Sequence, residues 1–273
     1  MHVAKRLGIP THLSTRPLTD PLRNSKAVTL MKDLRPSLAR QLRERELHAA
    51  LISPLDYAKE SSDYCLVPDV AVASGGNGSI VVRFREGLQH IKTLAVDPEF
   101  PAEILLTKII LAEEFDIEPT ILPLQATVEA MLEKADAALL TGDAAFYQWG
   151  VSENVIDIVE EWNEMTSLPY VHALWCGWAD QLSPKDIELL QTARKKGVEG
   201  LADIAKDYGK EQRRSVQEFL ESFTYDLTPE VREALAEFLR YLYYHGVMPD
   251  IADLNFYTRE QETGPLATDG SPP

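Results

Sequence analysis

Cysteine is scarce in this sequence, with only Cys65 and Cys176, which lie far apart. A disulfide framework needs paired cysteines, and a zinc knuckle needs closely spaced cysteine or histidine ligands. The six histidines form no cluster at metal-ligand spacing. We therefore expect two buried free thiols and no metal site.

Positive charge is also in short supply. The chain has 27 basic and 43 acidic side chains, which gives a formal net charge of −16. Such a surface does not offset the repulsion of a phosphate backbone, so the composition excludes a nucleic-acid partner.

Long apolar runs are missing as well. No segment approaches the roughly 20 apolar residues that span a bilayer, and residues 1–18 lack the apolar core of a secretory signal, interrupted as they are by Pro10 and Pro17. We therefore expect a cytoplasmic protein without a membrane partner. Residues 258–273 are rich in Gly, Pro and Ser without periodicity, which predicts a disordered tail.

The 273 residues are 45% apolar, enough for one large or two modest cores. Short apolar runs alternate with segments of helical period, a pattern typical of α/β proteins. Pro101, Ser183 and Thr228 stand where they would begin helices, and Gly246 where it would end one. The expected helices are 36–43, 101–115 and 127–134, and the expected strands are 49–52, 70–73, 79–84, 92–96, 137–140 and 170–175.

A glycine-rich segment runs from Ser74 to Ser79, with the sequence SGGNGS. Its glycines permit positive φ, so successive N–H groups could converge on a carboxylate. It could equally be a plain turn between two strands. It is not a nucleotide loop, because no Lys-Ser/Thr pair follows it.

A second candidate is Thr141-Gly142-Asp143, between an expected strand and a new helix. A helix start at the carboxyl edge of a sheet presents free N–H groups and a positive dipole end to an anion. The alternative is that Asp143 simply caps the helix.

Polar side chains also follow the first expected strand. The hydroxyls of Ser14 and Thr15 could reach a ligand or could merely end the strand. Arg16 could pair with a carboxylate through its planar fork, or lie in a solvated loop. His12, beside them, is more often a structural hydrogen-bonding group than a base.

Several motifs resemble one family when taken in order. They are HLSTRPL at 12–18, RELHAALISPLDY at 45–57, SGGNGSI at 74–80, ADAALLTGDAAF at 135–146 and WNEMTSLPYVHALW at 162–175. Their order and spacing resemble the chorismate dehydratases of the futalosine route to menaquinone, over almost the whole chain.

That resemblance implies a two-lobed type 2 periplasmic-binding-protein-like fold with a ligand cleft between the lobes. The expected lobes are residues 1–86 with 176–257, and residues 87–175. It also implies a hydro-lyase that converts chorismate to 3-[(1-carboxyvinyl)oxy]benzoate without a cofactor. Its ligand would be a small chorismate-like carboxylate; the oligomeric state is left open. The resemblance suggests Ser14 and Ser79 as catalytic residues, and as substrate-binding residues Thr15, Arg16, Ser53, Ser74, Asn77, Gly78, Thr141, Gly142, Asp143 and Trp175.

The sequence departs from the family pattern at two places. Ser14 stands where the family has Asn, and residues 100–103 read Phe-Pro-Ala-Glu where it has Ser-Arg-Thr-Ser. Glu103 would repel an anionic ligand unless its side chain turned away. Two alternatives therefore stay open, namely a lyase of the same fold acting on another carboxylate and a non-catalytic solute-binding protein.

Overall fold

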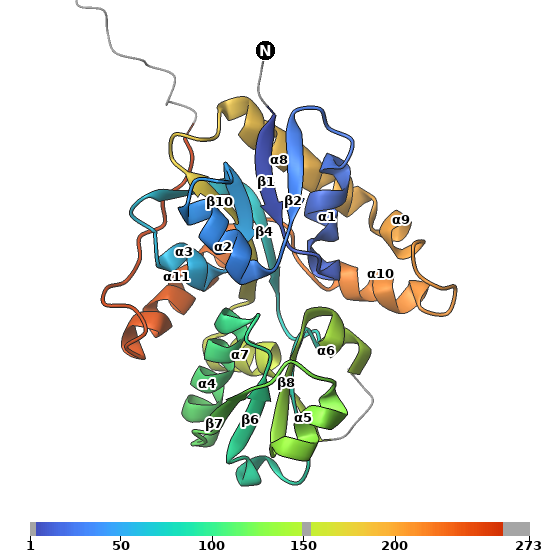
Figure 1. Ribbon diagram of the computed structural model, residues 1–273, viewed down its shortest axis with the longest axis vertical. Helices are drawn as coiled ribbons and strands as arrows, with labels where there is room; N and C mark the ends of the chain where they lie inside the picture. The colour runs from blue at the N-terminus through green and yellow to red at the C-terminus, as the bar shows by residue number, and fades with distance from the viewer. Residues whose placement is uncertain (1–3, 149–153, 259–273) are drawn as a thin grey trace, which may run out of the picture.

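The structure is a computed structural model and describes residues 4–148 and 154–258. These residues form two five-stranded sheets, and each sheet with its covering helices makes one lobe (Figure 1). The α/β prediction is confirmed. The expected disordered tail lies outside the described residues, apart from Thr258.

The first lobe contains the sheet β2-β1-β3-β10-β4. Strands β1, β2 and β3 are parallel, whereas β10 runs antiparallel to both β3 and β4. The strands are β1 (Lys5–Ile9), β2 (Val28–Lys32), β3 (Ala49–Ile52), β4 (Tyr64–Ser74) and β10 (Tyr170–Trp178). The helices are α1 (Arg16–Thr19), α2 (Arg35–Arg43), α3 (Pro54–Ala58), α8 (Pro184–Glu199), α9 (Leu201–Ala205), α10 (Arg213–Glu221) and α11 (Pro229–Tyr244), with 3₁₀ helices Leu13–Thr15 and Asp20–Leu22.

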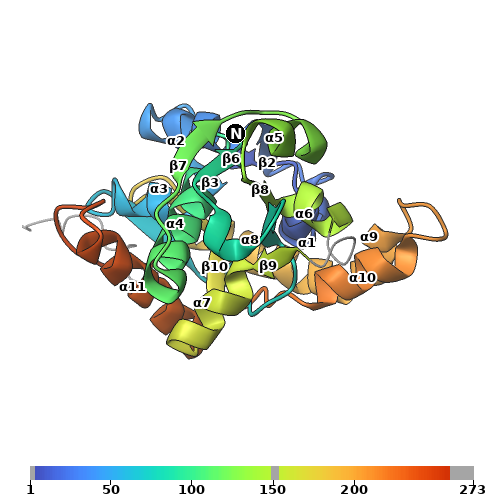
Figure 2. The same cartoon turned by 90° about the horizontal axis from the view of Figure 1, so that it is seen from below.

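The second lobe contains the sheet β7-β6-β8-β5-β9, in which β5 runs antiparallel to its neighbours β8 and β9. The strands are β5 (Ile80–Phe84), β6 (Thr93–Val96), β7 (Thr120–Pro123), β8 (Ala137–Thr141) and β9 (Val155–Asp157). The helices are α4 (Pro101–Phe115), α5 (Val128–Lys134), α6 (Gly142–Gln148) and α7 (Ile158–Thr166), with the 3₁₀ helix Leu88–His90. Seen from below, α11 and α10 extend to opposite sides of this lobe (Figure 2).

The chain passes between the lobes at residues slightly different from the boundaries that the sequence suggested. We expected residues 80–84 in the first lobe and 170–175 in the second. Instead β5 pairs with β8, and β10 pairs with β3 and β4. The chain thus passes between the sheets at residues 75–79 and 167–169, so each crossing is a few residues long.

Local signals position the helices as expected. Ser183 and Asp186 form a complete capping box at the start of α8, and the Thr127 and Thr228 hydroxyls accept N–H groups at the starts of α5 and α11. Pro101 opens α4, where its missing N–H costs nothing. Gly246, with φ of 67°, follows the end of α11.

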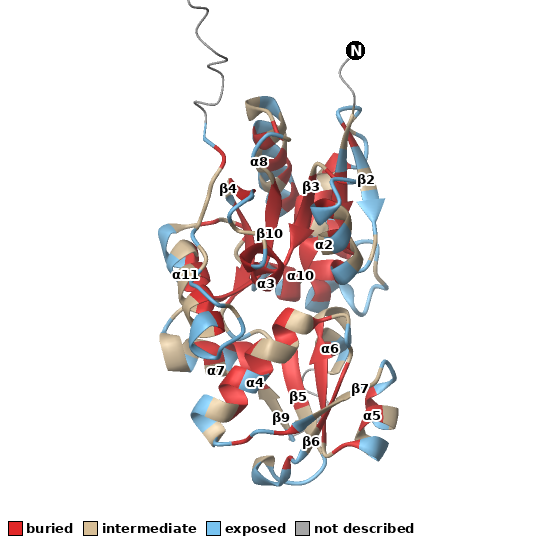
Figure 3. Ribbon diagram, turned by 60° about the vertical axis from the view of Figure 1, so that its left-hand side comes forward, coloured by how far each residue is buried: buried red, intermediate tan, exposed pale blue. Residues whose placement is uncertain are grey.

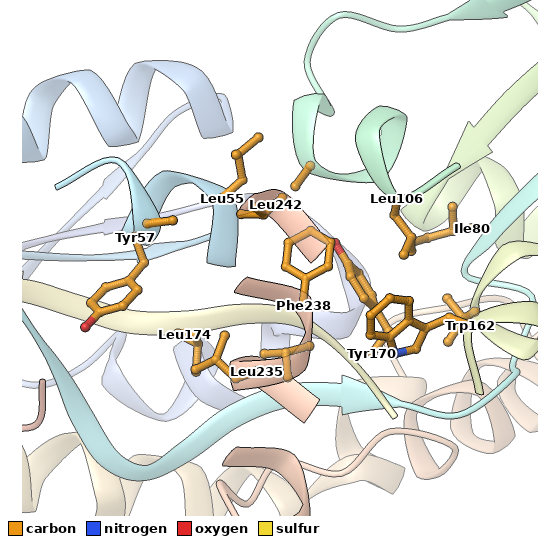
Figure 4. Packing of buried hydrophobic residues seen from close by; sticks show 14 of the residues in the cluster. Leu55, Tyr57, Ile80, Leu106, Trp162, Tyr170, Leu174, Leu235, Phe238 and Leu242 are labelled. Carbon is orange, nitrogen blue, oxygen red and sulfur yellow. The ribbon is translucent and has the colours of Figure 1, made fainter. Parts of the chain in front are cut away.

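The largest apolar core continues from one lobe into the other. It includes Leu174 of β10, Phe238 of α11, Ile80 of β5 and Trp162 of α7 (Figure 4). Two smaller clusters lie on the far faces of the two sheets. Burial is concentrated in the inner strands of the two sheets, whereas the edge strands β2 and β7 are mostly exposed or half-buried (Figure 3).

Both cysteines are buried free thiols, as expected. Within residues 4–148 and 154–258, no group of His, Cys, Asp and Glu side chains is arranged to hold a metal ion. None of the helices in this part of the chain is long and apolar enough to cross a membrane.

Candidate binding site between the lobes

The loop after β1 makes the first contact between the lobes. Ser14 and Thr15 are both buried in its 3₁₀ helix, and the Thr15 hydroxyl donates to the His12 carbonyl oxygen at 2.8 Å. The Leu13 N–H donates to Asp143 Oδ1, at the start of α6, at 2.9 Å. Asp143 therefore caps a turn of the opposite lobe, which corrects the interpretation that it caps its own helix.

The glycine-rich loop is held by the protein itself. The Gly78 N–H donates to Asp157 Oδ2 at 2.6 Å, and the Ser79 N–H donates to Asn77 Oδ1 at 3.1 Å. Ser74 shares a hydrogen bond of 2.8 Å with His172 Nε2. Two of the N–H groups of this loop, those of Gly78 and Ser79, are thus already bonded to side chains of the protein and do not converge on a ligand carboxylate.

The turn at Gly142 is similarly occupied. Its N–H donates to the Ser79 carbonyl oxygen at 2.8 Å, and Thr141 pairs with Ile80 in the sheet. In this conformation the turn does not offer the expected N–H of Gly142 to an anion. Gly142 has φ of +55°, a left-handed conformation that favours glycine, whereas a Cβ built there would meet His12 Nδ1 at an ordinary contact distance of 3.5 Å.

The guanidinium of Arg16 is already paired with carboxylates of the protein. Its Nε donates to Asp20 Oδ2 at 2.8 Å, and its Nη2 pairs with both Asp20 and Asp207. Because two carboxylates already neutralise it, Arg16 is a poor candidate for binding a ligand carboxylate. This differs from the role that the resemblance suggested.

Three further suggested residues have structural partners or surroundings of their own. Ser53 caps α3 and donates to Asp56 Oδ2 at 2.7 Å. The Asn77 amide donates to Ser222 and lines a pocket of about 420 Å³ between α6 and α10. Trp175 is 0% exposed within the core of the first lobe, so it is not an open wall of a cleft.

Several buried polar atoms nevertheless find no partner within the described protein. Each such atom is costly, by about 1–3 kcal/mol, and native proteins keep few of them. They include His12 Nε2, Ser79 Oγ, Glu103 Oε2, the Tyr170 hydroxyl and Trp175 Nε1. Ser79, one of the two suggested catalytic residues, thus keeps a buried hydroxyl that is available to a ligand.

An ion pair that sequence reasoning missed joins the lobes. Arg35 is the first residue of α2 in the first lobe, and its Nη1 donates to Oε1 of Glu103, in the first turn of α4 in the second lobe. The two side chains are 7% and 3% exposed. The Arg35 guanidinium also lies over the Phe100 ring, 5.5 Å from its centroid. Glu103 therefore neither turns away nor stands alone, because Arg35 neutralises it.

A sequence signal for Arg35 did exist. A cation in the first turn of a helix opposes the positive end of the helix dipole, so an arginine there is locally unfavourable. Arg35 occupies that position in α2 without an acidic neighbour in the same turn. Its partner, Glu103, is 68 residues away in the sequence, so the pattern alone does not show why Arg35 stands there.

The charge of Arg35 contributes to the pKa shifts of the groups around it. Burial, followed by the charge of Arg35, lowers the pKa of both His12 and His172 to about 3, so both imidazoles are neutral at physiological pH. Burial raises the pKa of the Tyr170 hydroxyl well above its usual value, with smaller effects from Glu103 and Arg35. We use the name interlobe site for His12, Arg35, Ser79, Glu103 and Tyr170 together. It combines the Arg35–Glu103 ion pair with neutral hydroxyl and imidazole groups.

The depressed pKa of His172 predicts a loss of stability in acid. Between about pH 6.5 and pH 3 the unfolded chain binds a proton at this residue that the native protein does not. Stability is therefore lost as the pH falls through this window. His172→Gln should remove this contribution, so the free energy of unfolding of the variant should gain about 2 kcal/mol relative to wild type between pH 7 and pH 5. Denaturant unfolding at the two pH values measures the change; a difference that does not vary with pH would contradict it.

Comparison with known proteins then identifies the family. Residues 5–244 match the sequence model of the menaquinone biosynthesis family. The chain belongs to this family. A chorismate dehydratase from Thermus thermophilus is 27% identical over 257 residues, which cover 85% of this chain and 93% of that protein.

Solved structures support the fold. Protein AF1704 from Archaeoglobus fulgidus aligns with a TM-score of 0.72 and 19% identity, covering 90% of this chain and 98% of that chain. The periplasmic aliphatic sulphonate binding protein SsuA from Escherichia coli aligns with a TM-score of 0.64 and 12% identity, covering 92% and 95%. The predicted periplasmic-binding-protein-like fold is thereby confirmed for this member of the menaquinone biosynthesis family.

Proposed function

We propose that this protein removes water from chorismate and so forms 3-[(1-carboxyvinyl)oxy]benzoate, without a cofactor. The observation that carries this proposal is the extent of the match to the Thermus thermophilus chorismate dehydratase, 93% of which is covered, together with membership of the menaquinone biosynthesis family. The interlobe site supports it, because Arg35 keeps N–H donors that its bond to Glu103 does not use and Ser79 Oγ has no partner among the described residues.

The reaction makes modest chemical demands on the protein. A proton leaves a ring carbon that is conjugated with the ring carboxylate, the hydroxyl on the neighbouring carbon departs as water, and the ring becomes aromatic. Negative charge grows on the ring carboxylate as the proton leaves. Hydrogen-bond donors held in advance in a water-poor site stabilise such charge strongly. Arg35 and Ser79 are the donors that we assign to this task.

We assign the base to the substrate rather than to the protein. The imidazole of His12, with a pKa near 3, is a weak base. The side-chain carboxylate of chorismate is tethered within reach of the ring and can take the proton itself. An essential histidine or carboxylate, shown by complete loss of turnover in a folded variant, would overturn this assignment.

We expect the purified protein to convert chorismate to an aromatic product in the presence of a metal chelator and without nucleotide. Absorbance and mass spectrometry follow the product, and calorimetry measures binding. The dehydratase proposal is wrong if chorismate is neither turned over nor bound. Binding without turnover would instead indicate the solute-binding alternative.

A further inference from the structure

The Arg35–Glu103 pair has a feature that ion pairing alone does not explain. Arg35 contacts Oε1 of Glu103, but Oε2 is buried and has no hydrogen-bond partner among the described residues. The Glu103 residue is 2% exposed, so bulk water does not solvate that oxygen. A buried acceptor of this kind is expensive unless a donor reaches it.

The guanidinium also retains unused donors. Within the part of the chain that the structure describes, the hydrogen bond of Arg35 to Glu103 uses Nη1. Arginine carries five N–H donors in a planar fork, and the fork binds a carboxylate through two parallel hydrogen bonds. A ligand carboxylate can therefore bind Arg35 while Glu103 stays in place.

These two observations define complementary halves of one recognition site. Arg35 offers its remaining donors to an anion, and Oε2 of Glu103 requires a hydrogen-bond donor close to that anion. A simple carboxylic acid satisfies the first half and leaves the second unpaired. A hydroxylated carboxylic acid satisfies both.

We propose that Glu103 is a specificity-determining residue, which accepts a hydrogen bond from a ligand hydroxyl while Arg35 binds the ligand carboxylate. The site thus selects hydroxylated cyclic carboxylic acids over the same acids without a hydroxyl group. This inference rests on the proposed function only in placing a carboxylate ligand between the lobes, and it requires no turnover.

Matched benzoates test the discrimination. Calorimetry with benzoate, 3-hydroxybenzoate and 4-hydroxybenzoate should show that at least one hydroxylated acid binds wild type about ten- to a hundredfold more tightly than benzoate. In Glu103→Gln the amide oxygen can keep the bond to Arg35, and the amide NH₂ then replaces Oε2. The ligand hydroxyl then loses its carboxylate acceptor and can only accept a weaker hydrogen bond from the neutral amide, so the preference should fall to less than about threefold.

The control is Glu114→Gln, the same substitution at an exposed position of the same helix. It should retain the wild-type preference, and thermal melting should show both variants folded. The proposal is overturned if wild type binds none of the three acids, if it binds them equally, or if Glu103→Gln keeps the preference. Because these probes cannot be dehydrated, a failure of chorismate turnover leaves this result readable by itself.

Discussion

Replacing Ser79 by Ala should lower the turnover of chorismate by about 10²- to 10³-fold, which is the usual effect of removing one preorganised donor to developing charge. The same change should leave the free energy of unfolding unchanged or raise it by about 1 kcal/mol. The reason is that Ser79 Oγ is buried and unpaired in the protein, so its removal relieves a desolvation cost. Steady-state kinetics and denaturant unfolding measure the two effects separately.

Ser74→Ala is the contrasting variant. The Ser74 hydroxyl is equally buried but is bonded to His172 at 2.8 Å. Its loss leaves the imidazole without this partner and should cost about 1–3 kcal/mol of stability. If Ser79→Ala destabilises the fold as much as Ser74→Ala does and retains wild-type turnover per folded molecule, Ser79 is structural.

The second large effect concerns Arg35. Arg35→Met should destabilise the protein by about 3–5 kcal/mol, because it leaves the Glu103 carboxylate buried without a counter-charge. The double variant Arg35→Met, Glu103→Met should recover most of that loss, since two apolar side chains of similar length carry no such penalty. Thermal and denaturant unfolding of the single and double variants measure the coupling between the two residues.

The matched control is Arg40→Met on the same helix. Arg40 pairs with Glu44, but both side chains are about half exposed, at 49% and 47%. Solvent screens such a pair, so its removal should change stability by no more than about 1 kcal/mol. Equal effects of the Arg35 and Arg40 substitutions would show that the interlobe pair is not a buried one in solution.

The helices illustrate what local sequence can predict. The starts of α4, α8 and α11 follow from Pro101, Ser183 and Thr228, because caps and first-turn prolines act on N–H groups within a few residues. The bounds of α4, Pro101–Phe115, agree with the expected helix. Nothing outside these segments is needed for such a prediction.

The lobe boundaries illustrate what local sequence cannot predict. Strands β5 and β10 were recognised as strands, but each was expected in the other lobe. An apolar run shows that a strand is buried, yet its partner is chosen by pairing with distant segments. β5 pairs with residues 137–141, and β10 with residues 49–52 and 64–74.

The site divides in the same way. By itself the sequence determined the fold class and the family motifs, because these depend on residue type and short spacing. Only the tertiary structure decided which of these groups are free. In it, the N–H groups of Gly78 and Gly142 donate to acceptors within the protein, and Arg35 of the first lobe pairs with Glu103 of the second. The physical reason is that the partners of these polar groups lie far away in the chain. The packing of the two lobes therefore decides whether a group is bonded within the protein or free to bind a ligand.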